Sequence, residues 1–303
     1  MITSLVKKLS TAPRYGYNNL IYPRLLNLKH RQTLRRNRAL KNSQQGKRCF
    51  IIGTGPSINK VDLASLRDEQ TFVVNDFIKH RAFDRLNPSY YVITDTGFFD
   101  SRAEDDFFGR NLHEKSDRIK TTTKMFLNVV GKDLIDRRKL FINHQVHYLS
   151  MQGIFSDHFN FNVAIDKTVP APKNIILACL MIAVYLGFEK IYLLGCEHSF
   201  LAKPIRQGTI HDIEHFYRAN YHNLDPNDAE AVREQGFERV VVLSYEAEIG
   251  HVKQLFKNYR LFYQKVKKNH PKVEIYNATP NSFLDVFPFI DFADIQFKRH
   301  GND

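Results

Sequence analysis

From residue 49 onward, short apolar runs alternate with longer amphipathic segments. The apolar runs have the length and composition of buried strands, at 49–52, 71–74, 90–94, 125–129, 140–143, 190–194 and 273–276. The segments between them have the spacing of helices, at 62–67, 101–111, 132–137, 173–186, 211–222, 227–235, 246–268 and 280–287. Strands that alternate with helices predict a mostly parallel sheet with helices on both faces. We therefore expect a single Rossmann-like α/β domain over residues 49–297.

The most apolar stretch of the chain, residues 175–186, leads directly into a predicted strand. It is too short to cross a bilayer, which takes about 20 apolar residues, so we expect a buried core helix. No apolar segment of the kind found in secretory signals is seen near the start. The three cysteines lie in apolar surroundings without C-x-x-C spacing, which predicts buried thiols in a reducing compartment: Cys49, Cys179 and Cys196.

Charge divides the chain at residue 48. The net charge is +12, and residues 1–48 contain twelve Lys and Arg but no Asp or Glu, so this basic arm carries the whole excess. The arm also holds leucines and tyrosines, and that mixture predicts a surface-lying anchor on an anionic membrane. We expect a cytoplasmic protein, peripheral on the inner face of the membrane. Nucleic-acid binding, a transit peptide or a solvated basic tail are the alternatives.

The first predicted strand ends in a glycine loop of five residues, Gly53, Thr54, Gly55, Pro56 and Ser57. Glycines let the backbone turn sharply and approach a ligand, and a following helix start offers N–H groups to an anion. The loop lacks the third glycine of the dinucleotide fingerprint and the Gly-Lys-Ser/Thr of a P-loop. The loop therefore predicts a backbone that contacts a phosphate group of a ligand. The alternative is an ordinary turn between a strand and a loop.

Polar residues follow three other predicted strands as well. Because ligands of parallel sheets bind at the carboxyl ends of strands, these residues predict a polar pocket suited to a nucleotide. They are Asn75 after the second strand, Asp95 and Thr96 after the third, and Gly195, Cys196, Glu197 and His198 after the sixth.

Residues 198–250 are unlike the rest of the chain. Five of the thirteen histidines lie between 198 and 251, interleaved with tyrosines and basic residues, which predicts an active-site lid that supplies a general base. His211 and His215 have the i, i+4 spacing of metal ligands but not the His-Glu-x-x-His pattern. No Asp-x-Asp is present, so we expect neither a metal nor a cofactor.

The order of these motifs resembles the bacterial lipooligosaccharide sialyltransferases and the motility-accessory-factor-type glycosyltransferases. The resemblance is carried by 51–57, Asn75, 186–195 and 276–282, in patches over roughly 49–290. It implies metal-independent, inverting transfer of a sugar, such as sialic acid, from a CMP-linked donor to a lipooligosaccharide or surface polysaccharide acceptor.

The resemblance also implies roles for single residues. His251 matches the catalytic base, with His215 in reserve, and Tyr217 and Tyr221 match lid tyrosines that hold the leaving phosphate. The residues that the family places around the donor correspond to Gly53, Thr54, Gly55, Ser57, Asn75, Asp95, Gly195 and Glu197. Their neighbours Pro56, Thr96, Cys196 and His198, together with Asn174, complete the predicted donor site. Asn174 stands where the family has a hydroxyl residue, and His198 stands where it has a phosphate-binding tyrosine.

Two other functions stay open at this point. A related nucleotide-dependent enzyme, such as a pterin diphosphokinase, would require ATP and magnesium, for which the sequence shows no acidic clasp. A noncatalytic nucleic-acid-binding protein would use the basic arm and show steep salt dependence, but we expect no nucleic-acid partner. The sequence leaves open whether the protein forms oligomers.

Overall fold

The computed structural model describes residues 17–99, 107–157, 161, 163–202 and 245–297. These residues form a parallel sheet of seven strands in the order β5-β4-β3-β2-β1-β6-β7. The Rossmann-like α/β prediction is confirmed. The strands are β1 Arg48–Ile52, β2 Gln70–Val74, β3 Tyr90–Ile93, β4 Lys124–Asn128, β5 Val146–Leu149, β6 Lys190–Leu194 and β7 Glu274–Asn277.

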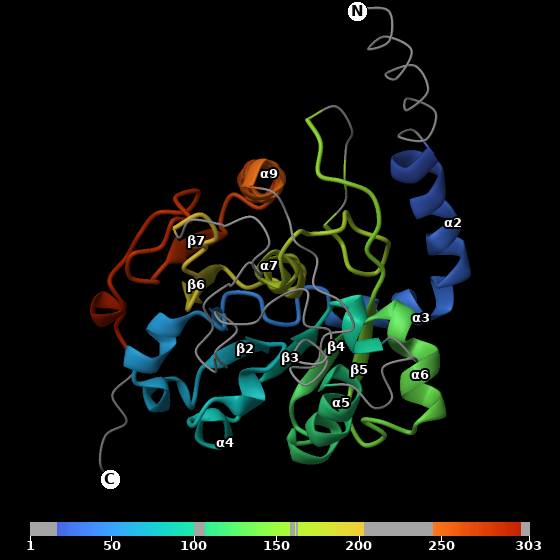
Figure 1. Ribbon diagram of the computed structural model, residues 1–303, viewed down its shortest axis with the longest axis horizontal. Coiled ribbons are helices and arrows are strands. Elements are labelled where there is room, and N and C mark those ends of the chain that lie inside the picture. The colour runs from blue at the N-terminus through green and yellow to red at the C-terminus, as the bar shows by residue number, and fades with distance from the viewer. Residues whose placement is uncertain (1–16, 100–106, 158–160, 162, 203–244, 298–303) are drawn as a thin grey trace, which may run out of the picture.

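Helices cover both faces of the sheet (Figure 1). On one face lie α7 (Ile175–Leu186) and α9 (Tyr245–Asn269), and on the other lie α4 (Phe83–Leu86), α5 (Phe107–Arg118) and α6 (Lys132–Arg137). Side chains alternate between the faces along each strand. In β1, Ile51 packs on the α7 side, whereas Phe50 and Ile52 pack on the opposite side. The two faces explain why the strands are apolar throughout.

Helix α7 is the buried helix predicted for the most apolar stretch. The Asn174 side chain caps it by accepting a hydrogen bond from the Ile176 N–H at 2.8 Å, and Gly187 ends it in the left-handed conformation, with φ of 90°. Every residue from Ile176 to Leu186 is buried. Over the part of the chain that the structure covers, no helix combines the length and the apolar character needed to span a bilayer.

Three local predictions differ from the structure. The run 140–143 is a turn and not a strand, because Lys139 and Phe141 are left-handed, with φ of 54° each; the strand begins six residues later, at Val146. Residues 280–287 form turns, and a left-handed Asn281 (φ 55°) breaks the expected helix. The segment 62–67 contains only a short 3-10 helix, Leu63–Leu66.

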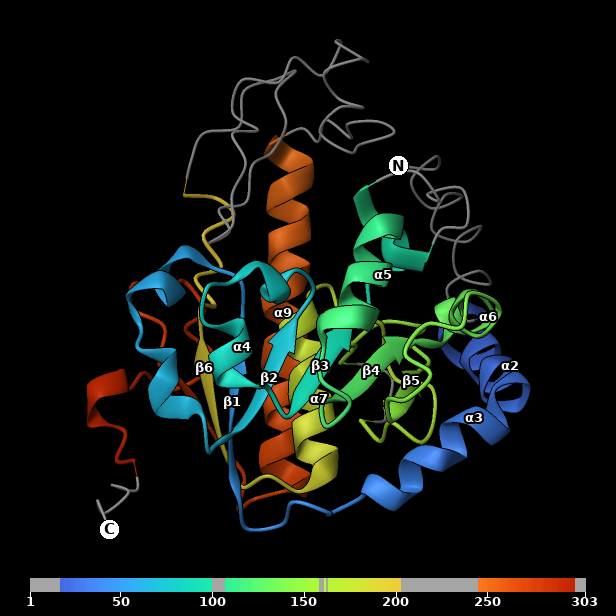
Figure 2. The same cartoon turned by 90° about the horizontal axis from the view of Figure 1, so that it is seen from below.

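Residues 17–40 run along the β5 side of the body, and the chain then crosses below the sheet to β1 (Figures 1 and 2). They form a π-helical turn at Tyr17–Ile21, α2 (Tyr22–Lys29), α3 (Arg31–Arg35) and a 3-10 helix, Arg36–Leu40. The fully buried Asn37 fixes the segment, because its Nδ2 donates to the Tyr148 and Ile165 carbonyls at 2.9 and 2.8 Å. This described part of the basic arm is therefore attached to the domain.

The three cysteines are free and buried, as predicted. Burial raises the pKa of the Cys49 and Cys179 thiols well above the usual range. Both thiols therefore stay protonated and act as small apolar side chains in the core.

Candidate functional site

The candidate site lies where the strand order changes direction, between β1 and β6. In open parallel sheets this position forms the ligand crevice. The loops that follow the two strands meet there: the Gly53 N–H donates to the Leu194 carbonyl at 2.7 Å, and the Gly55 N–H donates to the Gly195 carbonyl at 3.0 Å. A Cβ atom at Gly53 would lie 2.3 Å from the Gly195 carbonyl oxygen. Glycine is required there for the close approach of the two backbones.

Glu197 reaches from the β6 loop into the glycine loop. Its Oε1 accepts a hydrogen bond from the Ser57 N–H at 2.6 Å, and a Cβ atom at Gly55 would lie 1.5 Å from its Oε2. Gly55 therefore leaves the space that the carboxylate fills. Because Pro56 has no N–H and the amides of Gly53, Gly55 and Ser57 all donate within the protein, these amides are not free to approach a phosphate.

Three buried polar atoms at the carboxyl ends of β1, β2 and β6 have no hydrogen-bond partner within the described residues. They are Ser57 Oγ, Asn75 Oδ1 and Glu197 Oε2. Asn75 is also left-handed, with φ of 48°, and its carbonyl accepts a hydrogen bond from the Tyr91 hydroxyl. Buried polar atoms without partners are rare in native proteins and need an explanation. Strained backbone, at about 1–3 kcal/mol per residue, is enriched at ligand sites.

His198 supports the loop after β6 through both ring nitrogens. Its Nδ1 lies 3.0 Å from the Cys196 carbonyl oxygen and its Nε2 lies 2.9 Å from the Tyr259 hydroxyl. Burial lowers the pKa of His198 to about 4, so the ring is neutral. Because a carbonyl only accepts, Nδ1 donates and Nε2 accepts from Tyr259. Both ring nitrogens are used internally in this geometry, and the expected contact of His198 with the donor stays a prediction.

The turn Thr279–Ser282 holds the same loop from the other side. The Cys196 N–H donates to Thr279 Oγ1 at 3.0 Å, and Ser282 Oγ donates to the Cys196 carbonyl at 2.6 Å. The Cys196 thiol is buried, and burial raises its pKa. Cys196 is thus a positioning residue. In the sequence, the Thr-Pro-Asn-Ser stretch at 279–282 was part of the family resemblance, and its local pattern also indicated a helix start.

The remaining predicted residues have different places. Asp95 is exposed, and its Oδ1 accepts a hydrogen bond from the Gly97 N–H at 2.9 Å, while Thr96 is exposed beside it. Asn174 caps α7, with its Oδ1 3.5 Å from the Tyr259 hydroxyl. Thr54 is buried in the loop between the glycines.

The predicted base His251 is exposed in the first turns of α9. This end of α9 rises beyond the carboxyl edge of the sheet (Figure 2). The other lid residues that we singled out, His215, Tyr217 and Tyr221, lie outside the described residues, as does His211. No group of three or more His, Cys, Asp or Glu within the described part of the chain is arranged to hold a metal ion.

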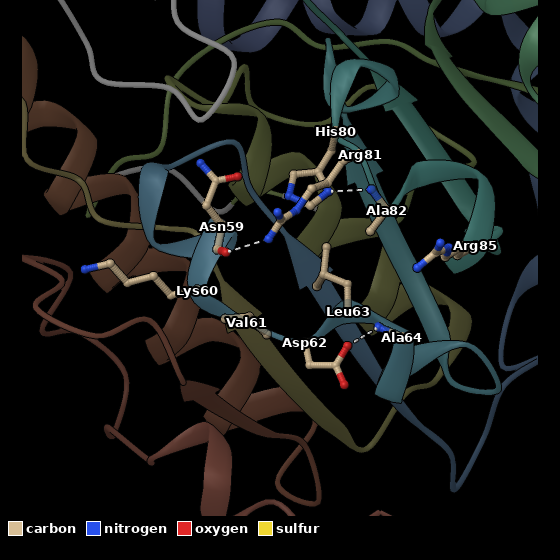
Figure 3. A pocket seen from close by; sticks show the side chains of 10 residues that line it. All are labelled: Asn59, Lys60, Val61, Asp62, Leu63, Ala64, His80, Arg81, Ala82 and Arg85. Atoms are coloured by element: carbon tan, nitrogen blue, oxygen red, sulfur yellow. Dashed lines mark hydrogen bonds between the residues drawn. The ribbon is translucent and has the colours of Figure 1, made fainter.

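A cationic cavity opens next to the glycine loop (Figure 3). Its volume is about 530 Å³, and it is lined by residues 59–64, 80–82 and 85. Lys60, Arg81 and Arg85 form no ion pair with any residue that the structure describes, and Arg81 makes one long hydrogen bond, 3.4 Å, to the Asn59 carbonyl. Asp62 is the acid of the lining, and it accepts a hydrogen bond from the Ala64 N–H. The sequence pattern did not predict this cavity, although the Lys-His-Arg run at 79–81 was a signal.

A buried ion pair lies at the end of β2. Lys115 of α5 is fully buried, and its Nζ donates to Asp76 Oδ1 at 2.6 Å. Burial lowers the pKa of Lys115, while Asp76 acts in the opposite direction. The pair ties α5 to the loop that carries Asn75, and it also escaped the sequence analysis because its members are 39 positions apart.

No protein-family model matches this chain, and no curated protein matches it. Among solved structures, it is similar to the MAf glycosyltransferase from Magnetospirillum magneticum AMB-1, with 13% sequence identity and a TM-score of 0.44. The match covers 89% of this chain and 39% of that protein. A likeness of this size assigns neither an activity nor site residues to the present chain.

Proposed function

We propose that this protein is a glycosyltransferase that binds a nucleotide-linked sugar at the carboxyl ends of β2, β1 and β6. The observation that carries the proposal is a set of buried polar atoms that have no hydrogen-bond partner among the described residues: Ser57 Oγ, Asn75 Oδ1 and Glu197 Oε2. Two of them are acceptors only, and the serine hydroxyl both accepts and donates. A ligand that satisfies all three must present several hydroxyl or amino hydrogens in a small volume, as a ribose or a hexose does.

The donor and acceptor classes follow from the motif resemblance. A CMP-linked sugar such as CMP-sialic acid is the donor to test first, and the acceptor is a hydroxyl of a lipooligosaccharide or surface polysaccharide. The geometry supports a nucleotide ligand because the site lies at the point where the strand order reverses.

The cationic cavity supplies the charge that a phosphate needs. The short 3-10 helix Pro56–Lys60 carries both Ser57 and the cavity residues Asn59 and Lys60. A ligand that contacts Ser57 therefore lies near the cavity mouth. Since the glycine-loop amides are used internally, we assign stabilisation of the departing phosphate to Lys60, Arg81 and Arg85, together with the lid tyrosines of the sequence prediction.

In the proposed reaction the acceptor oxygen attacks the anomeric carbon while the bond from that carbon to the phosphate oxygen breaks. His251 takes the proton of the attacking hydroxyl, and the electron pair leaves on the phosphate. General-base assistance of this kind contributes about 10²–10⁴-fold to the rate.

The first test is nucleotide binding by calorimetry, with CMP, UDP, GDP and ATP, each in EDTA and in magnesium. We expect binding of CMP in EDTA, and a loss of about tenfold for Ser57→Ala and for Glu197→Gln, the cost of about one hydrogen bond each. Ser43→Ala and Glu114→Gln are matched controls, because both residues are exposed and away from the sheet edge. Unchanged affinity in both site variants would refute the assigned site, and binding of ATP only with magnesium would favour the diphosphokinase.

The second test separates chemistry from binding. His251→Ala should lower turnover of the CMP-linked sugar by about 10²-fold or more while the affinity for CMP is retained. His113→Ala, an exposed histidine of α5, is the matched control. Retained turnover in His251→Ala would remove this residue as the base.

A further inference from the structure

The segment 17–28 turns its apolar side away from the protein. Six large apolar side chains are exposed there, with exposed fractions from 36% for Tyr22 to 67% for Leu28. Five of them follow a helical spacing that places them on one continuous stripe. The six residues are Tyr17, Leu20, Ile21, Tyr22, Leu25 and Leu28.

The opposite side of the same segment faces the domain and carries three asparagines beside Pro23 and Leu26. Asn19 Oδ1 accepts a hydrogen bond from the Ile154 N–H at 2.8 Å, and Asn27 Oδ1 accepts one from the Thr168 N–H. Both asparagines are only partly exposed. A surface helix of a globular protein normally packs its apolar stripe on the core and exposes its polar side. Here the orientation is reversed, and the side-chain hydrogen bonds to the body hold it in that orientation.

Cations surround the exposed stripe. Arg24 lies within it, Lys29, Arg31 and Arg35 follow it, and all four are exposed. No acidic residue occurs anywhere in residues 1–48. The surface therefore combines exposed leucines, tyrosines and positive charge, the composition of a helix that lies in the interface of an anionic bilayer.

We propose that the 17–28 face is a membrane-binding surface whose occupant is a bilayer containing anionic lipid. A nucleic-acid partner would be bound through its phosphate backbone, and that contact uses cations and polar groups. Six exposed apolar side chains would contribute nothing to it. A second copy of the chain, docked through the same face, would bring two sets of cations together. The domain lies behind the helix, so the helix rests in the plane of the interface and the body stays outside the lipid. This inference does not depend on the proposed catalytic function.

The test is co-flotation of the full-length protein with vesicles of phosphatidylcholine alone or with added phosphatidylglycerol. We expect flotation with the anionic vesicles, weakened by salt. Leu25→Ser with Leu28→Ser should lower the partition coefficient by about tenfold or more, because two leucines lose their burial in lipid. Arg31→Gln and Arg35→Gln should each lower it by about fivefold, because a basic residue near an anionic surface is worth about 1 kcal/mol.

The matched control is Val130→Ser with Ile142→Ser, two exposed apolar residues on other elements, at 64% and 69% exposure. This variant should float like the wild-type protein. Thermal melts of all variants should coincide, because each substituted side chain is exposed. The proposal is overturned if the wild type stays unbound at low salt or if the leucine pair floats unchanged. It is also overturned if that pair abolishes self-association or nucleic-acid binding without an effect on flotation.

Discussion

Two neighbouring glycines of the candidate site predict opposite kinds of defect when each is changed to alanine. At Gly55 a Cβ atom would lie 1.5 Å from Glu197 Oε2, the end of a side chain that can rotate away. At Gly53 it would lie 2.3 Å from the Gly195 carbonyl oxygen, which belongs to the backbone directly after β6 and accepts a hydrogen bond from the Gly55 N–H. Gly55→Ala should therefore damage the site, and Gly53→Ala should damage the fold.

The magnitudes follow from the contacts that are lost. Gly55→Ala expels the carboxylate and breaks the bond from the Ser57 N–H to Glu197, worth about 1.5–3 kcal/mol for a charged acceptor. Gly55 has an ordinary extended conformation (φ −67°, ψ 155°) that alanine also adopts. Alanine therefore adds about 0.4–1 kcal/mol of stability, because it lowers the conformational entropy of the unfolded chain. The net loss of unfolding free energy is about 1–2 kcal/mol. Gly53→Ala causes overpacking, which costs about 1–3 kcal/mol, and it weakens the hydrogen bond from residue 53 to Leu194. The total loss of unfolding free energy is about 2–4 kcal/mol.

Urea denaturation gives the unfolding free energies, and calorimetry with CMP gives the site affinity. We expect Gly55→Ala to stay folded and to lose CMP binding, and Gly53→Ala to show the larger shift of the urea midpoint. The reasoning is refuted if Gly53→Ala proves more stable than Gly55→Ala, or if Gly55→Ala keeps the stability and the nucleotide affinity of the wild type.

Three further predictions concern stability and are checked by urea denaturation. Asn37→Ala should lower the unfolding free energy by about 2–3 kcal/mol, because two hydrogen bonds are lost. Asn37→Asp should lower it further, because the carboxylate would face two carbonyl oxygens. Equal losses in the two variants would contradict this reasoning. His198 is neutral when folded, with its pKa lowered to about 4, but protonates near pH 6.5 when unfolded. Between these two pH values the unfolded state binds more protons than the folded state. The unfolding free energy therefore falls as the pH is lowered from 6.5 to 4, and the loss is about 2 kcal/mol at pH 5. In His198→Gln the unfolding free energy should fall less steeply over the same range. Lys115→Met should lower the unfolding free energy by about 3–5 kcal/mol, because buried Asp76 loses its 2.6 Å ion pair and keeps the longer one, 3.5 Å, to Lys79. Asp76→Asn with Lys115→Met should recover most of that loss, whereas additive costs of the two substitutions would refute the pairing.

The sequence alone determined the framework, because local patterns specify it. Six of the seven predicted strands overlap observed strands, and α6, α7 and α9 lie where the helical spacing placed them. The apolar runs are too short to span a membrane. Strands that are apolar on both faces are buried in parallel sheets that helices cover on each side. The same patterns placed Gly53, Ser57, Asn75 and Glu197 at strand ends, and the structure brings three of these ends together at the point where the strand order reverses.

Only the tertiary structure decided how those ends are used. Glu197 fills the glycine loop and Asp76 pairs with Lys115, and in both cases the partners lie far apart in sequence. Local propensity also misled at 140–143, where two left-handed residues turn the chain, and at Thr279–Ser282, where the turn binds the β6 loop. The sequence showed the charge of the basic arm. Which side of the 17–28 segment faces outward depends on hydrogen bonds that Asn19 and Asn27 accept from distant backbone amides. Such pairings arise from long-range packing, which no local pattern encodes.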